Sequence, residues 1–351
     1  MRQVRNCALL SAFVCLVAVC SQARVKSHAA SISEIEREAN SLFEQGKYAE
    51  AFVSYQQGAS LGSAKSQAFL GYMYASGKGV QRDPLQAFNW VSLAAEQDYA
   101  DAEDFLGLMY ETGLGTQQNY AQALTWYGKA ARQGNQKAEN GLGALYYHGL
   151  GTAQDYPRAL AWFSRAADQG YADAESNLGS MYFHGQGTPQ DYATAFAWFS
   201  KAANQGNPKA QHTLGWMYQE GLGTAKDASQ AFAWYSKAAQ QGITPAEDNL
   251  GFMYCEGLGT ERDYPQALAW FNKAALHGSA TAEGNLGYMY LKGLGVAKDL
   301  AQARILLEKA AIHGNETAKQ RLELLNKGAD QASALSASMT TAGAAMSEPA
   351  N

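Results

Sequence analysis

Residues 135–170 read NQKAENGLGALYYHGLGTAQDYPRALAWFSRAADQG, and this stretch predicts a pair of helices. In its first half, Asn135 suits a helix N-cap, and Leu142 and Tyr146 follow at helical spacing on one face. Gly149 and Gly151 then interrupt the pattern, because glycine reaches backbone angles that other residues adopt only with strain. The first half therefore predicts a helix that ends in a glycine turn.

The second half of the stretch predicts another helix. Asp155 is a candidate N-cap, and Ala159, Trp162 and Phe163 form a second apolar stripe that is expected to enter the core. Gly170 ends this helix. The 36 residues together predict one helical hairpin.

The same pattern occurs seven times with a constant step of 36 residues. The Leu-Gly pair of the first helix begins at Leu70, Leu106, Leu142, Leu178, Leu214, Leu250 and Leu286. The Trp of the second helix recurs from Trp90 to Trp270, and Leu306 takes its place in the last copy. Seven repeats are predicted, at 63–98, 99–134, 135–170, 171–206, 207–242, 243–278 and 279–314.

One hairpin is too small to fold by itself. Burying a Trp removes roughly 150–250 Å² from water, worth about 4–6 kcal/mol as an upper bound. Ordering the backbone costs roughly 1–2 kcal/mol for each residue of the hairpin, which is several times more. Neighbouring hairpins must share a continuous core, and the sequence therefore predicts an all-α fold, an α/α solenoid.

The ends of the array differ from its repeats. Residues 32–62 predict a shorter N-terminal hairpin without the Gly-x-Gly turn, and residues 315–328 predict one amphipathic C-terminal helix. Both are expected to cap the stack. Residues 329–351 are mostly Ala, Ser, Thr and Met without a helical face, and they are expected to be disordered.

Residues 1–23 resemble a signal peptide. Arg2 and Arg5 precede an apolar run from Cys7 to Cys20, which is shorter than the roughly 20 residues that a membrane-spanning helix needs. The expected location is therefore outside the cytoplasm, periplasmic or secreted, with association with an outer membrane as an alternative. Cys20 leaves lipid anchoring open as an alternative to simple cleavage, although Val19 before it is not the small residue that lipidation prefers.

Composition narrows the possible partners. The net charge is −5 and no Lys/Arg cluster is present, so nothing favours nucleic-acid binding. No later apolar run approaches the length of a membrane span. Cleavage of the leader would leave Cys255 as the last cysteine, without a disulfide partner in its own chain.

The recurring motif Ala-x-x-x-Leu-Gly-x-x-Tyr-x-x-Gly-x-Gly, followed by Asp, Trp and Ala-Ala-x-x-Gly, resembles the Sel-like repeat (SLR) family, over residues 63–314. This family is a branch of the tetratricopeptide (TPR) superfamily, and the leader indicates an exported bacterial member. The resemblance implies a right-handed superhelix that acts as an adaptor in signalling, in the bacterial envelope or in contact with host cells. A cysteine-rich subgroup is associated with β-lactam hydrolysis, but this chain lacks the paired cysteines of that subgroup.

Catalytic and metal-binding patterns are weak. No Ser stands three residues before a Lys, as a serine β-lactamase requires, so the alternative of an envelope hydrolase is disfavoured. The seven Gly-x-Gly motifs are interpreted as turns, and the Asp before each second helix, replaced once by Asn119, is interpreted as an N-cap; neither is interpreted as a phosphate or calcium site. His148 and His184 occupy equivalent positions in neighbouring repeats, expected roughly 20 Å apart. Cys255 has acidic neighbours, which would raise its thiol pKa. We expect no metal, no cofactor and no catalysis.

Binding is expected where the repeats differ from one another. In the tetratricopeptide hairpin the first helix lines the concave groove, and the variable positions of these helices are therefore the candidate contacts for a protein or peptide partner. The candidates are Tyr72, Tyr147, His148, Phe183, His184, Trp216, Glu220, Phe252, Glu256 and Tyr288. Trp216, Phe252 and Tyr288 would form an aromatic row, with Asp248 also at its rim; the alternative is that these rings pack against the neighbouring hairpin.

Overall fold

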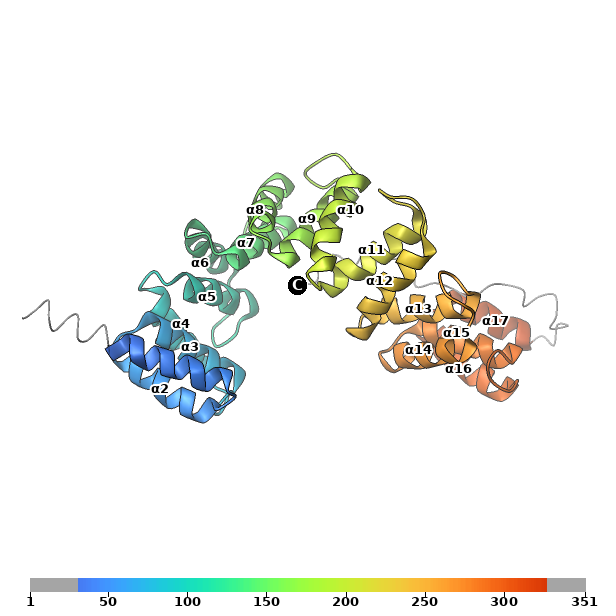
Figure 1. Ribbon diagram of the computed structural model, residues 1–351, viewed down its shortest axis with the longest axis horizontal. Helices are drawn as coiled ribbons and strands as arrows, with labels where there is room; N and C mark the ends of the chain where they lie inside the picture. Colours follow the sequence, from blue (N-terminus) through green and yellow to red (C-terminus); the bar gives the residue numbers. More distant parts are fainter. Residues whose placement is uncertain (1–30, 327–351) are drawn as a thin grey trace, which may run out of the picture. The chain divides into compact units, whose positions relative to one another are not determined.

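The computed structural model describes residues 31–326, and this part of the chain is helical without any β-strand (Figure 1). The seven predicted hairpins and the all-α solenoid are confirmed. A helix over 31–44 comes first. The others are α2 (Tyr48–Ser60), α3 (Ala64–Ser76), α4 (Pro84–Ala95), α5 (Ala100–Thr112), α6 (Tyr120–Arg132), α7 (Gln136–His148), α8 (Tyr156–Asp168), α9 (Ala172–His184), α10 (Tyr192–Asn204), α11 (Pro208–Glu220), α12 (Ala228–Gln240), α13 (Thr244–Glu256), α14 (Tyr264–Leu276), α15 (Ala280–Lys292), α16 (Leu300–Ile312) and α17 (Glu316–Asn326).

The chain divides into two compact units, with the boundary after Asp155. Unit 1 contains the helix over 31–44 and α2 to α7, and unit 2 contains α8 to α17. Within each unit the two helices of a repeat pack together, as α5 does on α6, and the second helix packs on the next repeat, as α4 does on α5. The predicted signal peptide, Cys20 and the whole of the predicted disordered tail lie outside the described residues.

The end segments are also helical. The helix over 31–44 and α2 occupy the region expected to form the N-terminal hairpin, and α2 packs on α3. At the other end α17 packs on α16. Its Leu325 is buried with Leu291 and Ala303, while Lys319 and Glu323 are exposed.

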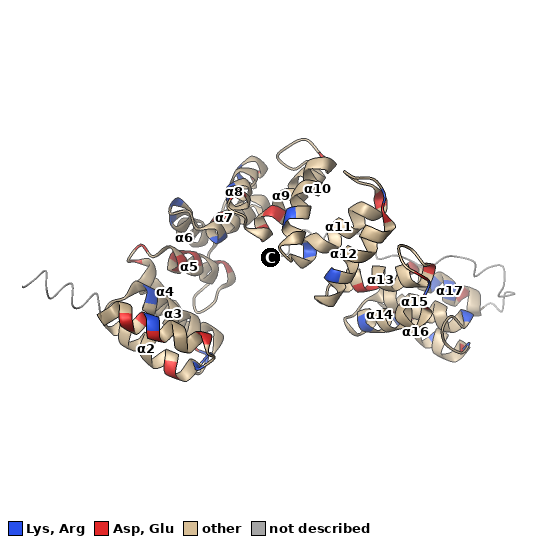
Figure 2. Ribbon diagram, in the orientation of Figure 1, with Lys and Arg blue, Asp and Glu red and all other residues tan. Residues whose placement is uncertain are grey.

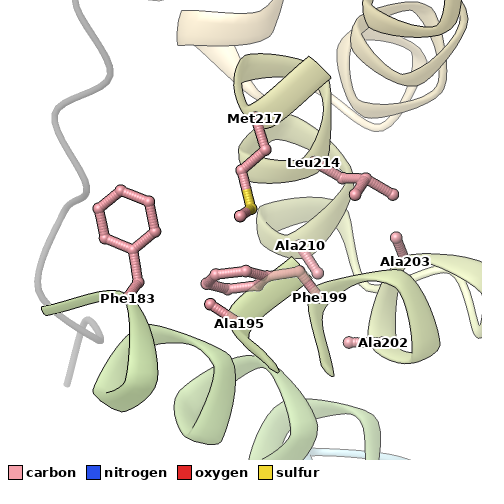
Figure 3. Close-up of a cluster of buried hydrophobic side chains, with 8 residues drawn as sticks. All are labelled: Phe183, Ala195, Phe199, Ala202, Ala203, Ala210, Leu214 and Met217. Atoms are coloured by element: carbon pink, nitrogen blue, oxygen red, sulfur yellow. The ribbon is translucent and has the colours of Figure 1, made fainter. Parts of the chain in front are cut away.

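Each hairpin contributes a small apolar cluster to the core. Figure 3 shows one of them in unit 2, where Phe199 of α10 is surrounded by alanines and lies near Leu214 and Met217 of the following helix α11. All three side chains are at most 2% exposed. Since the cluster joins two successive repeats, the core is continuous from one hairpin to the next within the unit.

The recurring Trp differs from the expectation that it is a core residue. The fully buried position is the one after it, with Tyr127, Phe199 and Tyr235 as examples, whereas each Trp is only partly buried. In repeats 2, 4, 5 and 6 a Lys one turn later lies over the open ring, as Lys201 does at 3.7 Å from the Trp198 centroid, and in repeat 3 Arg165 takes this place. The indole can remain at the surface because its outer face makes a cation–π contact.

Two kinds of glycine hold the hairpins close. In repeats 2, 4, 5 and 6 the glycine of the Leu-Gly pair faces the buried ring of the second helix, and a Cβ at Gly215 would lie 2.8 Å from the Tyr235 ring. In the Gly-x-Gly turn the first glycine ends the helix in the left-handed conformation, as Gly221 does with φ 74°. The second, Gly223, lies against the Tyr192 carbonyl of the preceding repeat. This turn therefore joins neighbouring repeats.

The recurring acid before each second helix is an N-cap, as predicted. The Asp83 carboxylate accepts hydrogen bonds from the amides of Leu85 and Gln86, at 3.1 and 3.0 Å. Asn119, Asp191, Asp227, Asp263 and Asp299 cap their helices in the same manner. These side chains satisfy amides that a helix start would otherwise leave open.

A buried polar pair closes the repeats internally. A first-helix side chain accepts a hydrogen bond from a residue 30 positions later, just after the second helix; the Glu103 carboxylate and the Gln133 amide are 2.8 Å apart. Glu175–Gln205 repeats this arrangement at 2.8 Å. In the last two repeats the later residue is histidine, and His277 and His313 contact Glu247 and Glu283 at 2.8 and 2.9 Å.

Links between repeats alternate along the chain. In repeats 1, 3, 5 and 7 the N-cap of the first helix is Ser63, Asn135, Asn207 and Ser279. Each also donates to an acid of the preceding hairpin: Glu36, Asp101, Asp173 and Asp248, respectively. In repeats 2, 4 and 6 this position holds Tyr99, Tyr171 and Ile243, which make no side-chain cap. The stack thus has a second period of two repeats.

Candidate functional site

The first helices of unit 1 share a row of side chains that reach the surface, some exposed and some half-buried. On α5, Asp101, Asp104, Leu108 and Thr112 follow at helical spacing, and we call this row and its equivalents on other first helices the first-helix face. Tyr72 of α3 and Leu108 of α5 are equivalent positions, and they are 39% and 42% exposed. Large apolar side chains so open to solvent, one repeat apart, are available for contact with a partner.

Tyr72 belongs to a group of rings around one ammonium. The Lys78 Nζ lies 5.3–5.4 Å from the ring centroids of Phe43, Tyr48 and Tyr72. It also donates a hydrogen bond to the Tyr72 hydroxyl at 3.2 Å, and this bond is the main cause that raises the pKa of Lys78. In most other repeats the residue between the two turn glycines is leucine. Lys78 therefore takes the place of an apolar side chain and orients Tyr72.

Asp104 stands one helical turn before Leu108 and is largely buried. Among the described residues, no hydrogen bond or ion pair reaches its carboxylate. Burial raises its pKa to about 7, with Asp101 and Glu111 acting in the same direction and Lys137 in the opposite one. The first-helix face of unit 1 thus pairs an exposed apolar side chain with a poorly solvated, unpaired carboxylate.

The two candidates at the end of α7 have different environments. Tyr147 is only 6% exposed, and its ring lies 4.9 Å from that of His148, which is half-buried. Tyr147 thus offers little surface, and His148 is the more accessible of the pair.

In unit 2 the aromatic candidates pack against neighbouring hairpins. Phe183 is 6% exposed and belongs to the cluster in Figure 3. Trp216, from the next repeat, is half-buried with its ring centroid 5.5 Å from that of Phe183. His184, beside Phe183, is exposed. Trp216 therefore packs against the neighbouring hairpin with one part of its ring and leaves another part open to a partner.

The remaining candidates lie nearer the C-terminal end. Phe252 and Tyr288 are half-buried and pack on the cluster around Phe271. The Arg321 guanidinium of α17 lies 4.6 Å from the Tyr288 centroid and covers part of that ring. Glu220 and Glu256 are exposed.

Asp248 is not at the rim, contrary to the expectation. It is 3% exposed, because α13 presents it to the following repeat, where the Ser279 hydroxyl donates to it at 2.5 Å. Burial raises its pKa to about 7. Sequence spacing placed Asp248 on the binding face but could not show that the next hairpin covers it.

The repeat alignment places Leu108 and Asp104 in registers of the binding groove, but neither was among the candidate contacts. Leu108 is equivalent to Tyr72, so this signal was present in the sequence. The exposure of Leu108 and the unpaired carboxylate of Asp104 depend on side-chain positions that the sequence does not give.

Reactive groups are sparse among residues 31–326. Burial, with a smaller effect of Glu256, raises the pKa of the Cys255 thiol to about 12, in the predicted direction. Such a thiol is a poor nucleophile at neutral pH. Within the same range, no cluster of three or more His, Cys, Asp or Glu side chains could hold a metal ion.

The sequence matches a known repeat family over most of its length. Seven consecutive segments match the Sel1 repeat, at 64–99, 100–135, 136–171, 172–207, 208–243, 244–279 and 280–315. These bounds lie one residue after the predicted ones. A comparison with curated protein sequences gave no significant match.

Solved structures give two informative similarities. A protective antigen present in uropathogenic Escherichia coli strains, which displays an SLR fold, is 39% identical, with a TM-score of 0.72 over 79% of this chain. The match covers 60% of the length of that antigen. A Sel1 repeat protein from Oxalobacter formigenes is 33% identical, with a TM-score of 0.61 over 86% of this chain and 90% of its own. In residues 31–326, none of the helices has the length and apolar character needed to cross a membrane.

Proposed function

Because the chain belongs to the Sel1 repeat family, we propose that it is a non-enzymatic scaffold that binds a segment of a partner protein across its first-helix face. Sel1 repeat proteins generally act as protein-interaction scaffolds. The finer statement, that this chain binds through the variable positions of its first helices, is our proposal.

One observation supports this proposal above the others. Recurring apolar side chains of the first helices are buried, such as Leu106 and Met109 of α5 at 1% and 0% exposure, whereas Leu108 between them is 42% exposed. Constant residues support the stack, and variable exposed residues remain available for recognition. Large apolar and aromatic side chains of this kind are typical anchors of protein interfaces.

The accessible candidates are Tyr72, Leu108 and His148 in unit 1, and His184, Trp216, Glu220, Phe252, Glu256 and Tyr288 in unit 2. Tyr147 and Phe183 lie beneath them as packing partners. Binding by such a face needs no reactive group, which agrees with the unreactive thiol of Cys255.

The proposed location is the periplasm or the exterior of a bacterial cell, in envelope function or contact with a host. The basic and apolar pattern of residues 1–23 supports export. The structural match with a protective antigen of uropathogenic Escherichia coli supports a role at the cell boundary. N-terminal sequencing and fractionation of the expressed full chain test it: a chain that starts near residue 24 outside the cytoplasm is expected, whereas an uncleaved cytoplasmic chain would contradict it.

Site-specific photo-cross-linking in the native cells tests the binding face. A photoreactive amino acid is placed at Tyr72, Leu108, Trp216 or Tyr288, and as controls at Leu93 and Leu276 of second helices, which are 45% and 86% exposed. First-helix positions are expected to give discrete adducts that mass spectrometry identifies as one partner. If adducts form equally at the control positions, binding is not confined to this face.

A further inference from the structure

Helix α5 carries more acidic side chains than any other first helix. It carries Asp101, Glu103, Asp104 and Glu111 and has no Lys or Arg (Figure 2). Glu103 is buried against Gln133, Glu111 accepts from the Tyr127 hydroxyl at 2.6 Å, and Asp101 accepts from Asn135 at 3.0 Å. Three of the four acids thus have partners within the protein, and the Asp104 carboxylate has none.

Asp104 and Leu108 are placed to act together. They are four residues apart on one helix, so their side chains project from the same face about one turn, roughly 5–6 Å, apart. A buried carboxylate without a partner is costly, and a cation brought to it recovers part of the lost solvation. Leu108 is 42% exposed, and the segment that carries this cation would also bury its apolar surface.

Resting on the function proposed above, we propose that the α3–α5 part of the first-helix face binds a cationic amphipathic segment of the partner protein. An apolar side chain of that segment lies on Tyr72 and Leu108, and a Lys or Arg about one helical turn away pairs with Asp104. Lys65 and Lys137 occupy the positions equivalent to Asp101 on the neighbouring first helices α3 and α7, and they disfavour a second cation at this surface. The surface therefore selects one basic residue next to an apolar one and disfavours a uniformly basic peptide.

Fluorescence anisotropy with synthetic helical peptides tests this assignment on the full chain at about pH 8. The probe is a labelled amphipathic peptide of Leu and Lys, and its matched forms carry Gln or Glu at each Lys. The Lys peptide is expected to bind about tenfold more tightly than the Gln peptide, and the Glu peptide more weakly still. Failure of the Lys peptide to bind, or equal binding by the Glu peptide, would overturn the proposal.

Two substitutions locate the contact and two provide controls. Asp104→Asn and Leu108→Ala are each expected to weaken binding of the Lys peptide about five- to tenfold. Glu96→Gln and Leu93→Ala, an exposed acid and an exposed leucine associated with second helix α4 of the same unit, should leave it unchanged. If all four variants bind like the parent chain, or all four weaken alike, the proposed contact is wrong.

A folding defect can be separated from a lost contact. Asn at position 104 removes a poorly solvated charge, so the Asp104→Asn chain should be at least as stable as the parent at pH 8 in urea unfolding. Weaker binding by a more stable protein cannot result from unfolding. If cross-links form at Trp216 and Tyr288 while Asp104→Asn and Leu108→Ala bind the Lys peptide like the parent chain, the scaffold function stands and only this contact is wrong.

Discussion

At residue 98 the chain departs from its own repeat. Asp98 has φ 58°, in the region that the equivalent residues Gly134, Gly170, Gly206, Gly242, Gly278 and Gly314 also occupy. A Cβ at Gly134 or Gly242 would meet nothing within 4 Å, so space does not demand glycine there. The positive φ favours glycine at this position, because an L-residue with positive φ is strained. Aspartate tolerates this conformation better than most residues.

Replacing Asp98 should therefore reveal this strain. Asp98→Gly is expected to raise the free energy of unfolding by about 0.5–1 kcal/mol, and Asp98→Val to lower it by about 1–2 kcal/mol, because a β-branched residue suits positive φ least. Urea unfolding followed by circular dichroism measures both. Equal stability of the three chains would mean that the turn relaxes at no cost.

The two buried aspartates make stability depend on pH. The pKa values of Asp104 and Asp248 are about 7 in the folded protein, against about 4 in the unfolded chain. Between these values the unfolded state loses protons first, so the free energy of unfolding should fall as pH rises from about 4 to 7. Each three-unit shift corresponds to at most about 4 kcal/mol.

Asp104→Asn and Asp248→Asn check that dependence. Each variant should be more stable than the parent at pH 8, and the difference should shrink towards pH 4. The measurement is the urea midpoint at several pH values, with the exposed Asp168→Asn as control. A parent chain whose stability is flat from pH 5 to pH 8 would show that neither carboxylate is desolvated.

Single residues were predictable to different degrees. The acid before each second helix could be assigned as an N-cap because capping depends on neighbours in sequence, as Asp83 shows with its bonds to residues 85 and 86. Glu103 could not be assigned in the same way. An acid in the first turn of a helix usually faces solvent. Glu103 can be buried because the side-chain amide of Gln133, 30 residues later, donates a hydrogen bond to its carboxylate.

Among the elements, the Gly-x-Gly turn has the clearest dependence on neighbouring repeats. The length of the turn and the positions of its glycines can be read from the sequence of one repeat. Its contact with the preceding repeat cannot. The second glycine of the turn lies against the backbone at the start of the preceding second helix: Gly115 against Pro84, Gly223 against Tyr192 and Gly259 against Ala228. A Cβ at any of them would overlap backbone atoms, which cannot move aside as a side chain can.

Gly223→Ala and Gly242→Ala separate this contact from backbone strain. Both glycines have positive φ, 69° and 83°, but only Gly223 touches another repeat. Gly242→Ala is expected to cost about 1–2 kcal/mol from the backbone angle alone. Gly223→Ala should cost about 3 kcal/mol or more, since the hairpins must also separate. Calorimetry of both variants measures this, and equal losses would mean that the turn does not hold the stack.

The second helices show a limit of pattern reading at the scale of an element. An alternation of Ala with Trp and Phe predicts a helix with an apolar stripe, but it does not say which aromatic residue is central. In the structure Phe199 is 2% exposed and Trp198 is half-buried under Lys201. The constancy of Trp therefore reflects a surface contact with Lys as well as packing.

At the scale of the whole chain, repeats are not interchangeable even though each is 36 residues long. Asp173 of repeat 4 accepts from Asn207 of repeat 5 at 2.7 Å, and Asp248 of repeat 6 accepts from Ser279 of repeat 7 at 2.5 Å. Even-numbered repeats thus provide an acceptor to the repeat that follows them. The alternation of Ser or Asn with Tyr or Ile is visible in the sequence, yet its meaning depends on a contact between hairpins.

Deletions of one and two repeats should therefore differ. Removing 207–278 joins repeat 4 to repeat 7 and brings the N-cap Ser279 to Asp173, whereas removing 207–242 brings Ile243 there and leaves Asp173 without a donor. Both chains should unfold cooperatively with unchanged helicity per residue, since each remaining hairpin still has neighbours. The one-repeat deletion should therefore lose more than half of the stability that the two-repeat deletion loses, by about 1 kcal/mol for the missing hydrogen bond. Urea unfolding followed by circular dichroism decides, because a stack of equivalent repeats would lose stability in proportion to the number removed.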